Sequence, residues 1–274
     1  MPQTPTFERC VASLLGPLVL GTLLAGCSAG RAEPMRASRT DSVDLAHCFS
    51  AVTTAAPADA TRCPPPVAAA IAEAAPLCRD FGGVLVPHEE AEVWTLDADG
   101  NGSAELAFEI NGLVTCENAW SAFSCGSRDC PKTLYEARGG GWREIATLYA
   151  GAPERLEVLV EAVGGYRTLR VCADAPACDE QWYYEWQGAE YDRTFIDVRG
   201  HRVDFAGSIH GFATFLGDTA VLAEPLPGAA VLDRYGAGVD AVIVGTAEDA
   251  DYYYVSPCNA CGNGFVEKAA VRLD

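Results

Sequence analysis

The chain has 274 residues, of which 49% are hydrophobic, so it is long enough and apolar enough to bury a core. Its 38 acidic and 19 basic side chains give a formal net charge of −19 at pH 7. This charge argues against a nucleic-acid partner, because phosphate contacts need clustered lysine and arginine. It would attract a basic protein, although solubility alone is the simpler reason for it.

The N-terminal segment 10–26 is uncharged and is followed by Cys27. It is shorter than the roughly 20 apolar residues that a membrane-spanning helix needs, and Pro17 interrupts it. The sequence Leu-Leu-Ala-Gly-Cys at 23–27 resembles the cleavage site of a bacterial lipoprotein. The resemblance implies a signal peptide over residues 1–26 and a lipid on Cys27, with an ordinary secretory signal peptide as the alternative.

The residues after Cys27 indicate where the protein is held. Ser28, and not aspartate, follows the lipidated position, which by resemblance to enterobacterial sorting implies the outer membrane and a body that faces the periplasm. The chain would then contact the membrane through its N-terminal lipid. Serine, alanine and arginine are frequent in the next residues, so we expect a flexible tether over 27–46.

Of the twelve cysteines, one lies in the segment 10–26 and one is Cys27. The other ten are even in number, which in an exported protein predicts up to five disulfides. Cys172 with Cys178, and Cys258 with Cys261, are candidate pairs because they are close in the chain, and the other connections stay open. A redox pair or half of a zinc site is the alternative at Cys258 and Cys261. The ten are Cys48, Cys63, Cys78, Cys116, Cys125, Cys130, Cys172, Cys178, Cys258 and Cys261.

A first domain is expected over residues 47–205. Three prolines at 64–66 precede an alanine-rich stretch, which predicts a short helix over 66–79 because proline is tolerated at a helix start and alanine is the best helix former. From Val84 onward, segments rich in valine, tryptophan, tyrosine, leucine and isoleucine alternate with Gly, Asp and Asn turns. This pattern predicts a mainly β, disulfide-rich β-meander domain with a short N-terminal helical segment.

Residues 97–105 read Asp-Ala-Asp-Gly-Asn-Gly-Ser-Ala-Glu and join two of the predicted strands. Oxygen-bearing side chains at every second position are typical of loops that hold a hard cation such as Ca²⁺. An EF-hand is excluded, since Phe108 stands where the last bidentate glutamate would be. The candidate ligands are Asp97, Asp99, Asn101, Ser103 through its carbonyl, and Glu105.

This loop resembles those of integrin-type, FG-GAP-like β repeats, in which Asp-x-Asp-x-Asn-Gly joins two strands. The resemblance implies a structural Ca²⁺ ion and not a catalytic one. A metal-free hairpin turn is the alternative, because aspartate, asparagine and glycine favour turns in any case.

A second domain is expected over residues 206–274, where five short β segments are separated by proline and glycine. It resembles a bacterial SH3-like barrel. In that family tryptophan usually occupies the place of Phe265, and the insertion 258–261 is unusual. The motifs that carry the resemblance are Leu-Pro-Gly at 226–228, the segment 235–245, Tyr-Tyr-Val at 253–255 and Gly-Phe-Val at 264–266.

Aromatic residues of this second domain form a candidate binding surface. Tyr252, Tyr253 and Tyr254, with Phe265, would stack on a glycan or peptide, as in wall-binding SH3 domains. The alternative is that one face of this strand packs into the barrel core, since neighbouring side chains on a strand point to opposite faces.

Catalytic motifs do not stand out. The four histidines show no metal-binding spacing, and no Gly-x-Ser-x-Gly elbow is present. We therefore expect a non-catalytic binding protein, an inhibitor or immunity protein against a basic periplasmic cell-wall hydrolase or toxin. The alternatives are an envelope protein that binds peptidoglycan through the SH3-like domain, and an unrecognised envelope hydrolase.

Overall fold

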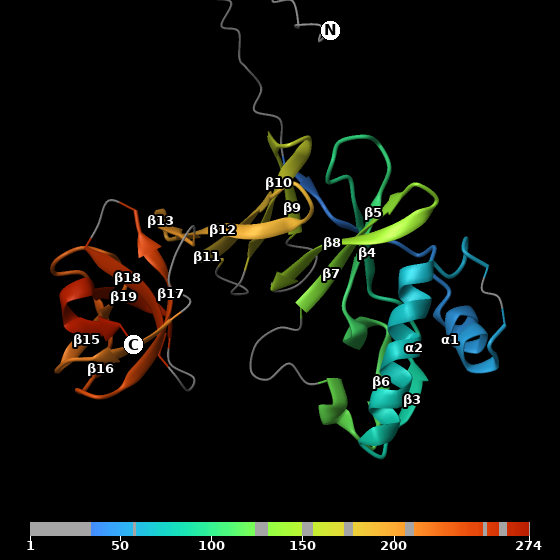
Figure 1. Ribbon diagram of the computed structural model, residues 1–274, viewed down its shortest axis with the longest axis horizontal. Coiled ribbons are helices and arrows are strands. Elements are labelled where there is room, and N and C mark those ends of the chain that lie inside the picture. The colour runs from blue at the N-terminus through green and yellow to red at the C-terminus, as the bar shows by residue number, and fades with distance from the viewer. Residues whose placement is uncertain are drawn as a thin grey trace, which may run out of the picture. The chain divides into compact units, whose positions relative to one another are not determined.

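The computed structural model describes residues 34–56, 59–123, 131–149, 156–172, 178–205, 211–248, 251–257 and 262–273 (Figure 1). The expected signal peptide, Cys27, Cys258 and Cys261 lie outside the described residues. Contacts between Cα atoms group Glu33–Asp274 into one compact unit. None of the helices in the described ranges has both the length and the apolar character needed to cross a bilayer.

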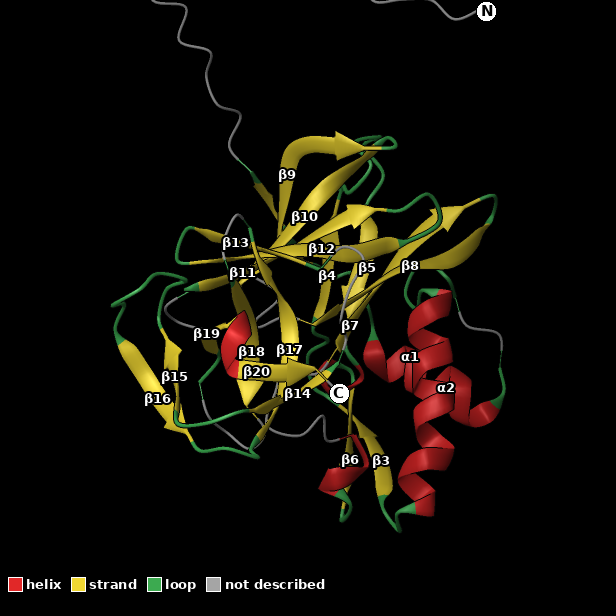
Figure 2. Ribbon diagram, turned by 60° about the vertical axis from the view of Figure 1, so that its left-hand side comes forward, coloured by secondary structure: helices red, strands yellow, loops and turns green. Residues whose placement is uncertain are grey.

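The N-terminal part of this unit contains two helices that lie side by side, next to a two-stranded sheet (Figures 1 and 2). The helix predicted over 66–79 is confirmed and extends one residue further at each end. The preceding helix was not predicted, because it begins inside the expected tether. The elements are α1 (Leu45–Thr54), α2 (Pro65–Asp80), β3 (Val84–Pro87) and β6 (Val114–Glu117), with the 3-10 turns η1 (Ile110–Gly112) and η2 (Trp120–Phe123).

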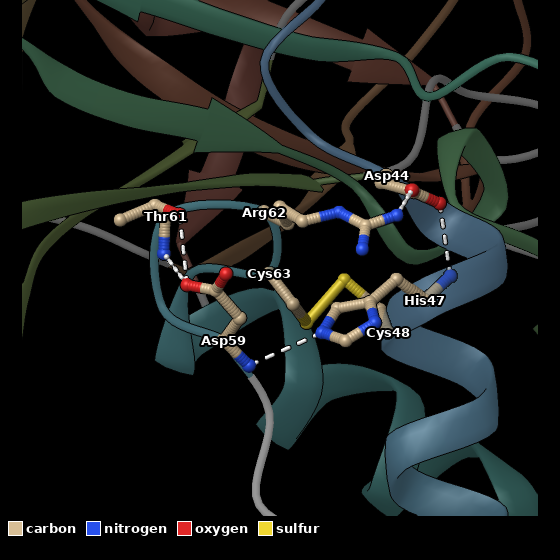
Figure 3. Close-up of polar contacts among 7 residues, drawn as sticks. All are labelled: Asp44, His47, Cys48, Asp59, Thr61, Arg62 and Cys63. Atoms are coloured by element: carbon tan, nitrogen blue, oxygen red, sulfur yellow. Dashed lines mark hydrogen bonds and ion pairs between the residues drawn. A yellow bond between two sulfur atoms is a disulfide. The ribbon is translucent and has the colours of Figure 1, made fainter.

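Asp44 fixes the start of α1 as its N-cap (Figure 3). Its Oδ1 accepts a hydrogen bond from the backbone N–H of His47 at 2.9 Å, and this bond is the main reason that the pKa of Asp44 lies below its usual value. The following loop folds back onto the helix, since the N–H of Asp59 donates to Nε2 of His47 at 3.1 Å. The disulfide Cys48–Cys63 closes the same loop covalently.

Three disulfides are formed among the described cysteines. Cys172–Cys178 confirms the pair expected from proximity. Cys78–Cys116 joins the end of α2 to β6, and Cys48–Cys63 ties α1 to the residues before α2. Sequence reasoning left the last two connections open, because neither is between neighbours in the chain.

The tether expected over 27–46 must be corrected within the described residues. Met35 pairs with Val158, and Ser38 pairs with Thr95, so two short strands form before α1 begins. Each adds to the edge of a different sheet, because an edge strand leaves backbone groups free to pair. The chain is therefore part of the fold from Met35 onward. These strands are β1 (Met35–Arg36) and β2 (Ser38–Arg39).

The mainly β fold class is confirmed, with antiparallel pairing between the described strands. The smaller of the two main sheets has the order β2-β4-β5-β7-β8. In the larger one, the path is β1-β9-β10-β11-β12-β13-β17-β18-β19-β15-β16, and β14 pairs with β17 and β20. The remaining bounds are β4 (Val93–Leu96), β5 (Glu105–Phe108), β7 (Pro131–Arg138), β8 (Gly141–Tyr149), β9 (Leu156–Val163), β10 (Tyr166–Cys172), β11 (Glu180–Trp186), β12 (Tyr191–Val198), β13 (His201–Asp204), β14 (Phe212–Phe215), β15 (Thr219–Leu222), β16 (Val231–Tyr235), β17 (Asp240–Ala247), β18 (Tyr252–Pro257), β19 (Gly264–Glu267) and β20 (Val271–Leu273).

The central core is shared by the two main sheets. Leu134 and Ile145 from the smaller sheet are buried in the same cluster as Leu169 and Ile196 from the larger one. Alternation along each strand produces this arrangement, because every second side chain points to the same face. Near one end of the core, the rings of Tyr166 and Trp186 stack with their centroids 3.7 Å apart.

The C-terminal strands have a core of their own, built from Phe215, Ile243 and Val255 with smaller neighbours. They are nevertheless continuous with the central part, since Val203 in β13 pairs with Ala247 in β17 across the expected boundary at 206. A 3-10 turn, η4 (Lys268–Ala270), precedes the last strand. The larger sheet therefore connects the central core to the C-terminal core.

Candidate metal site and ligand pocket

The loop at 97–104 joins β4 to β5, as expected from the sequence. Backbone N–H groups of the loop donate to its own carboxylates. Gly102 donates to Oδ2 of Asp97 at 3.2 Å, and Ala98 donates to Oε2 of Glu105 at 2.6 Å. Gly100 has φ +72°, in the left-handed region that glycine adopts without strain, so the chain wraps tightly around these carboxylates.

Three of the five candidate ligands converge in the structure. Carboxylate oxygens of Asp97, Asp99 and Glu105 all lie within 4.8 Å of one another. Glu105 is only 1% exposed, and this burial raises the pKa of its carboxyl to about 7. Oδ1 of Asp97 is buried and finds no hydrogen-bond donor among the described residues. Converging oxygens, one of them without a donor, fit a hard cation such as Ca²⁺.

The other two candidate ligands lie on the same loop but bond within it. The side-chain amide of Asn101 donates to Oδ2 of Asp99 at 2.5 Å, and its carbonyl oxygen accepts from the N–H of Ser103 at 2.5 Å. The second of these is the bond of an Asx turn, and the first joins two side chains of the loop. The side-chain oxygen of Asn101 would therefore have to give up its hydrogen bond from Ser103 before it could bind a cation.

The larger sheet anchors this loop. The carbonyl of Ala98 accepts from the N–H of Arg167 at 2.7 Å and from the hydroxyl of Tyr191 at 3.3 Å. The guanidinium of Arg167 lies against Gly100, where an added Cβ would be 2.9 Å from Nη2. The loop is thus held between the two main sheets, with one positive charge beside it.

The aromatic stacking surface expected on β18 and β19 must be corrected. Tyr252, Tyr254 and Phe265 are all buried in the central core, so they do not form an exposed stacking surface, although Tyr254 lines the pocket described below. Tyr253 is half-buried against the C-terminal core and Lys268 lies over its ring, 5.6 Å from the centroid. Sequence alternation predicted two faces for this strand, but both faces pack against protein.

A pocket that sequence reasoning missed lies between β11 and the C-terminal strands. Its volume is about 530 Å³, within the usual range for small-molecule sites. Acidic, apolar and amide groups all contribute to its wall. The lining residues are Asp179, Glu180, Val198, Arg199, Ala223, Leu232, Asp233, Tyr254, Gly262, Asn263 and Gly264.

Glu180 is the buried carboxylate of this pocket, with 8% of its surface exposed. Its Oε1 accepts from the indole N–H of Trp182 at 2.5 Å, and its Oε2 accepts from the hydroxyl of Tyr254 at 2.9 Å and the amide of Asn263 at 3.1 Å. Burial, and then the charge of Glu180, raise the pKa of Tyr254, so its hydroxyl stays a donor at neutral pH. The signal for this site was in the sequence, since Glu180 shares its strand face with Trp182 and Trp186.

The described histidines contact separate parts of the fold. His47 accepts from Asp59, His88 shares a hydrogen bond of 2.7 Å with Thr115, and Nε2 of His201 lies 3.9 Å from Glu224. This agrees with the lack of histidine pairing in the sequence.

Comparison of the chain with protein-family models, with curated proteins and with solved structures finds no match.

Proposed function

We propose that this chain is a non-catalytic binding protein of the cell envelope, held at the periplasmic face of the outer membrane by a lipid on Cys27. Its partner is a basic cell-wall hydrolase or toxin, which it inhibits as an immunity protein would. The observation that carries this proposal is the distribution of charge over the fold. An excess of negative charge steers a positive partner and speeds its association.

The positive side chains of the fold are largely engaged with carboxylates. Ion pairs of this kind join Arg39 to Glu90, Arg170 to Glu157 and Arg234 to Asp218, among others. Because acidic residues outnumber basic ones two to one, many carboxylates remain beyond those that form pairs. Exposed examples between α2 and β6 are Asp80, Glu89, Glu92 and Glu117.

The test is inhibition of lysis. The chain without its signal peptide, carrying Cys27→Ser, is added to purified peptidoglycan sacculi and a strongly basic muramidase, and turbidity is followed. We expect slower lysis at low salt, relieved by added salt since exposed charges are screened. A triple variant with Asp80→Asn, Glu89→Gln and Glu92→Gln should inhibit less than a control variant with Asp218→Asn, Asp233→Asn and Asp240→Asn, which loses the same number of negative charges. Undiminished lysis at low salt would refute the proposal.

The anchor has its own test. Wild-type protein should fractionate with outer membranes, and the Cys27→Ser variant should be released into the periplasm. If the Cys27→Ser variant stays in the membrane fraction, a lipid on Cys27 is not what holds the protein there.

Binding of peptidoglycan through an SH3-like domain is the second candidate. The strand order β20-β14-β17-β18-β19, with the hairpin β15–β16 inserted after β14 and a 3-10 turn before β20, supports a small barrel of this kind. Sedimentation of the protein with sacculi in the absence of any hydrolase would favour this function. If the protein stays in the supernatant when the sacculi are sedimented, this result counts against binding of peptidoglycan.

We also propose that Asp97, Asp99 and Glu105 hold a structural Ca²⁺ ion. The buried, unpartnered oxygen of Asp97 supports a cation at this place. Melting curves in Ca²⁺ and in chelator should differ for the wild type and coincide for Asp99→Ala. Coincident curves for both proteins would exclude the ion.

A further inference from the structure

The turn that joins α2 to β3 exposes three large apolar side chains, which we call the apolar tip. Leu77 is 43% exposed, Phe81 56% and Val84 57%, whereas Ile71 and Cys78 of the same helix are fully buried. Leu77 and Phe81 are four positions apart, a spacing that makes side chains neighbours on a helix surface. Single exposed apolar residues are ordinary on a protein surface, but three of them within one short turn indicate a contact surface.

The backbone under the apolar tip is held in one conformation. The N–H of Phe81 donates to the carbonyl of Leu77 at 3.3 Å, and the N–H of Gly83 donates to the carbonyl of Cys78 at 3.0 Å. The disulfide Cys78–Cys116 then joins the last turn of the helix to β6. Less conformational freedom is lost on binding when the backbone is already fixed, so these side chains are suited to anchor a complex.

The turn is packed on one side and open on the other. A Cβ added at Gly83 would collide with Sγ of Cys116. A Cβ added at Gly82, the preceding residue, would meet nothing within 4 Å. Figure 1 shows the turn at the end of α2, where the chain enters β3 beside β6. The apolar tip is therefore supported from the inside and can be approached from the outside.

Negative charge flanks the apolar tip. Asp80 precedes Phe81, and Glu117 stands directly opposite Val84 in the pairing of β3 with β6. Neither carboxylate forms an ion pair with another of the described residues. Arg79 is the one basic residue in the segment 73–84. Three carboxylates in this region are exposed, against that single guanidinium: Glu73, Asp80 and Glu117.

We propose that the apolar tip is the surface through which this chain docks on its basic partner. Phe81 occupies an apolar hollow of the partner, and lysine or arginine side chains at the edge of the hollow face Asp80 and Glu117. Charge selects this occupant, because a negative rim attracts a positive surface and repels a negative one. An aromatic centre with a polar rim is also the usual composition of a specific interface. The inference rests on the proposed function for the nature of the partner, and it adds the place of contact.

The anchor is tested by binding kinetics. The mature chain carrying Cys27→Ser is immobilised, and association and dissociation of the strongly basic muramidase of the lysis assay are recorded at low and at high salt. Phe81→Ala should raise the dissociation rate at least about tenfold and leave the association rate unchanged, because loss of a buried apolar anchor acts on dissociation. Since Phe81 is exposed in the free chain, the melting curve should not change.

The matched control is Phe212→Ala, which removes a similarly exposed ring from β14. This variant should bind the muramidase with the rates of the wild type. The pair separates a specific contact of Phe81 from a general effect of exposed aromatic surface.

The negative rim is tested by a second pair of variants. Asp80→Asn with Glu117→Gln should lower the association rate severalfold at low salt, and the difference should shrink at high salt because exposed charges are screened. Glu190→Gln with Asp192→Asn removes the same number of exposed charges at the turn between β11 and β12. It should slow association less, because these charges are not beside the apolar tip.

The outcomes separate this inference from the proposed function. If the wild type binds the muramidase and Phe81→Ala dissociates at the same rate, the apolar tip is not the contact, and the proposed function stands. If the wild type does not bind, both are overturned. A dimer of the chain alone that Phe81→Ala abolishes, seen by analytical ultracentrifugation, would assign the apolar tip to self-association and also overturn the inference.

Discussion

The N-terminal part, from α1 to β6, and the C-terminal part, from β14 to β20, stabilise their cores in different ways. Four half-cystines, Cys48, Cys63, Cys78 and Cys116, are among the most buried residues of the N-terminal core. Among the described residues, the C-terminal core contains no half-cystine and depends on noncovalent packing of side chains such as Phe215 and Ile243, on strands that pair along their length. The helix α2 is rich in alanine, which buries little apolar area, so covalent links contribute a larger share of stability there.

The largest expected effect comes from breaking the longest covalent loop. Replacing Cys78 and Cys116 by serine removes a link between residues 38 positions apart, which should lower the free energy of unfolding by about 4 kcal/mol. The same change at Cys172 and Cys178, only 6 positions apart, should cost about 2 kcal/mol. Chemical denaturation of both double variants gives the comparison. Equal losses would show that loop length does not set the contribution of these links.

The matching test for the C-terminal core is Phe215→Ala. Phe215 is fully buried and stacks on Tyr235 with ring centroids 5.4 Å apart, so the cavity left behind should cost about 3 to 4 kcal/mol. Phe212, on the same strand, is 60% exposed, and Phe212→Ala should change stability by less than about 0.5 kcal/mol. Similar losses in the two variants, measured by denaturation, would contradict the assignment of this core.

The last prediction concerns the loop between the sheets and depends on pH. In chelator, folded Glu105 keeps its proton up to a pKa of about 7, whereas in the unfolded chain it releases it near 4.5. Protonated Glu105 therefore favours the folded state. This contribution to the free energy of unfolding, about 3 kcal/mol in total, is fully present below about pH 4.5 and is lost as the pH rises to about 7. Unfolding at pH 5 and pH 8 should show this loss in the wild type.

The control is Glu105→Gln, which has no carboxyl to titrate. Its stability should fall less between pH 5 and pH 8 than that of the wild type, and the difference isolates this one group from other titrating residues. If the free energy of unfolding changes with pH in the same way for the two proteins, Glu105 does not cause the loss of stability.

Local patterns predicted local structure well. The alanine-rich stretch after the prolines at 64–66 became α2, and the loop from Asp97 to Glu105 joins two strands as its spacing indicated. Both features depend on residues that are close together in the chain, so a local sequence pattern can predict them. The helix α1 was missed, although Asp44 three residues before His47 is a helix-start signal.

Long-range packing could not be predicted in the same way. Alternation at Tyr252 to Tyr254 gives two faces, but only tertiary contacts decide that both are covered. The pocket around Glu180 needs Tyr254 and Asn263, which are more than 70 positions away in the chain. Alternation on β11 predicts that Glu180 points to the same face as Trp182 and Trp186, but no local pattern shows which distant residues complete the pocket, so the pocket itself became visible only in the structure.

The early strand β1 limits how far a lipid anchor can hold this body from a membrane. Eight peptide units separate Cys27 from Met35, and a fully extended chain of that length reaches at most about 29 Å. A lipid on Cys27 would therefore keep the edge of the larger sheet within roughly the thickness of one bilayer core from the headgroups. A partner that binds near β1 would therefore meet the protein beside the membrane.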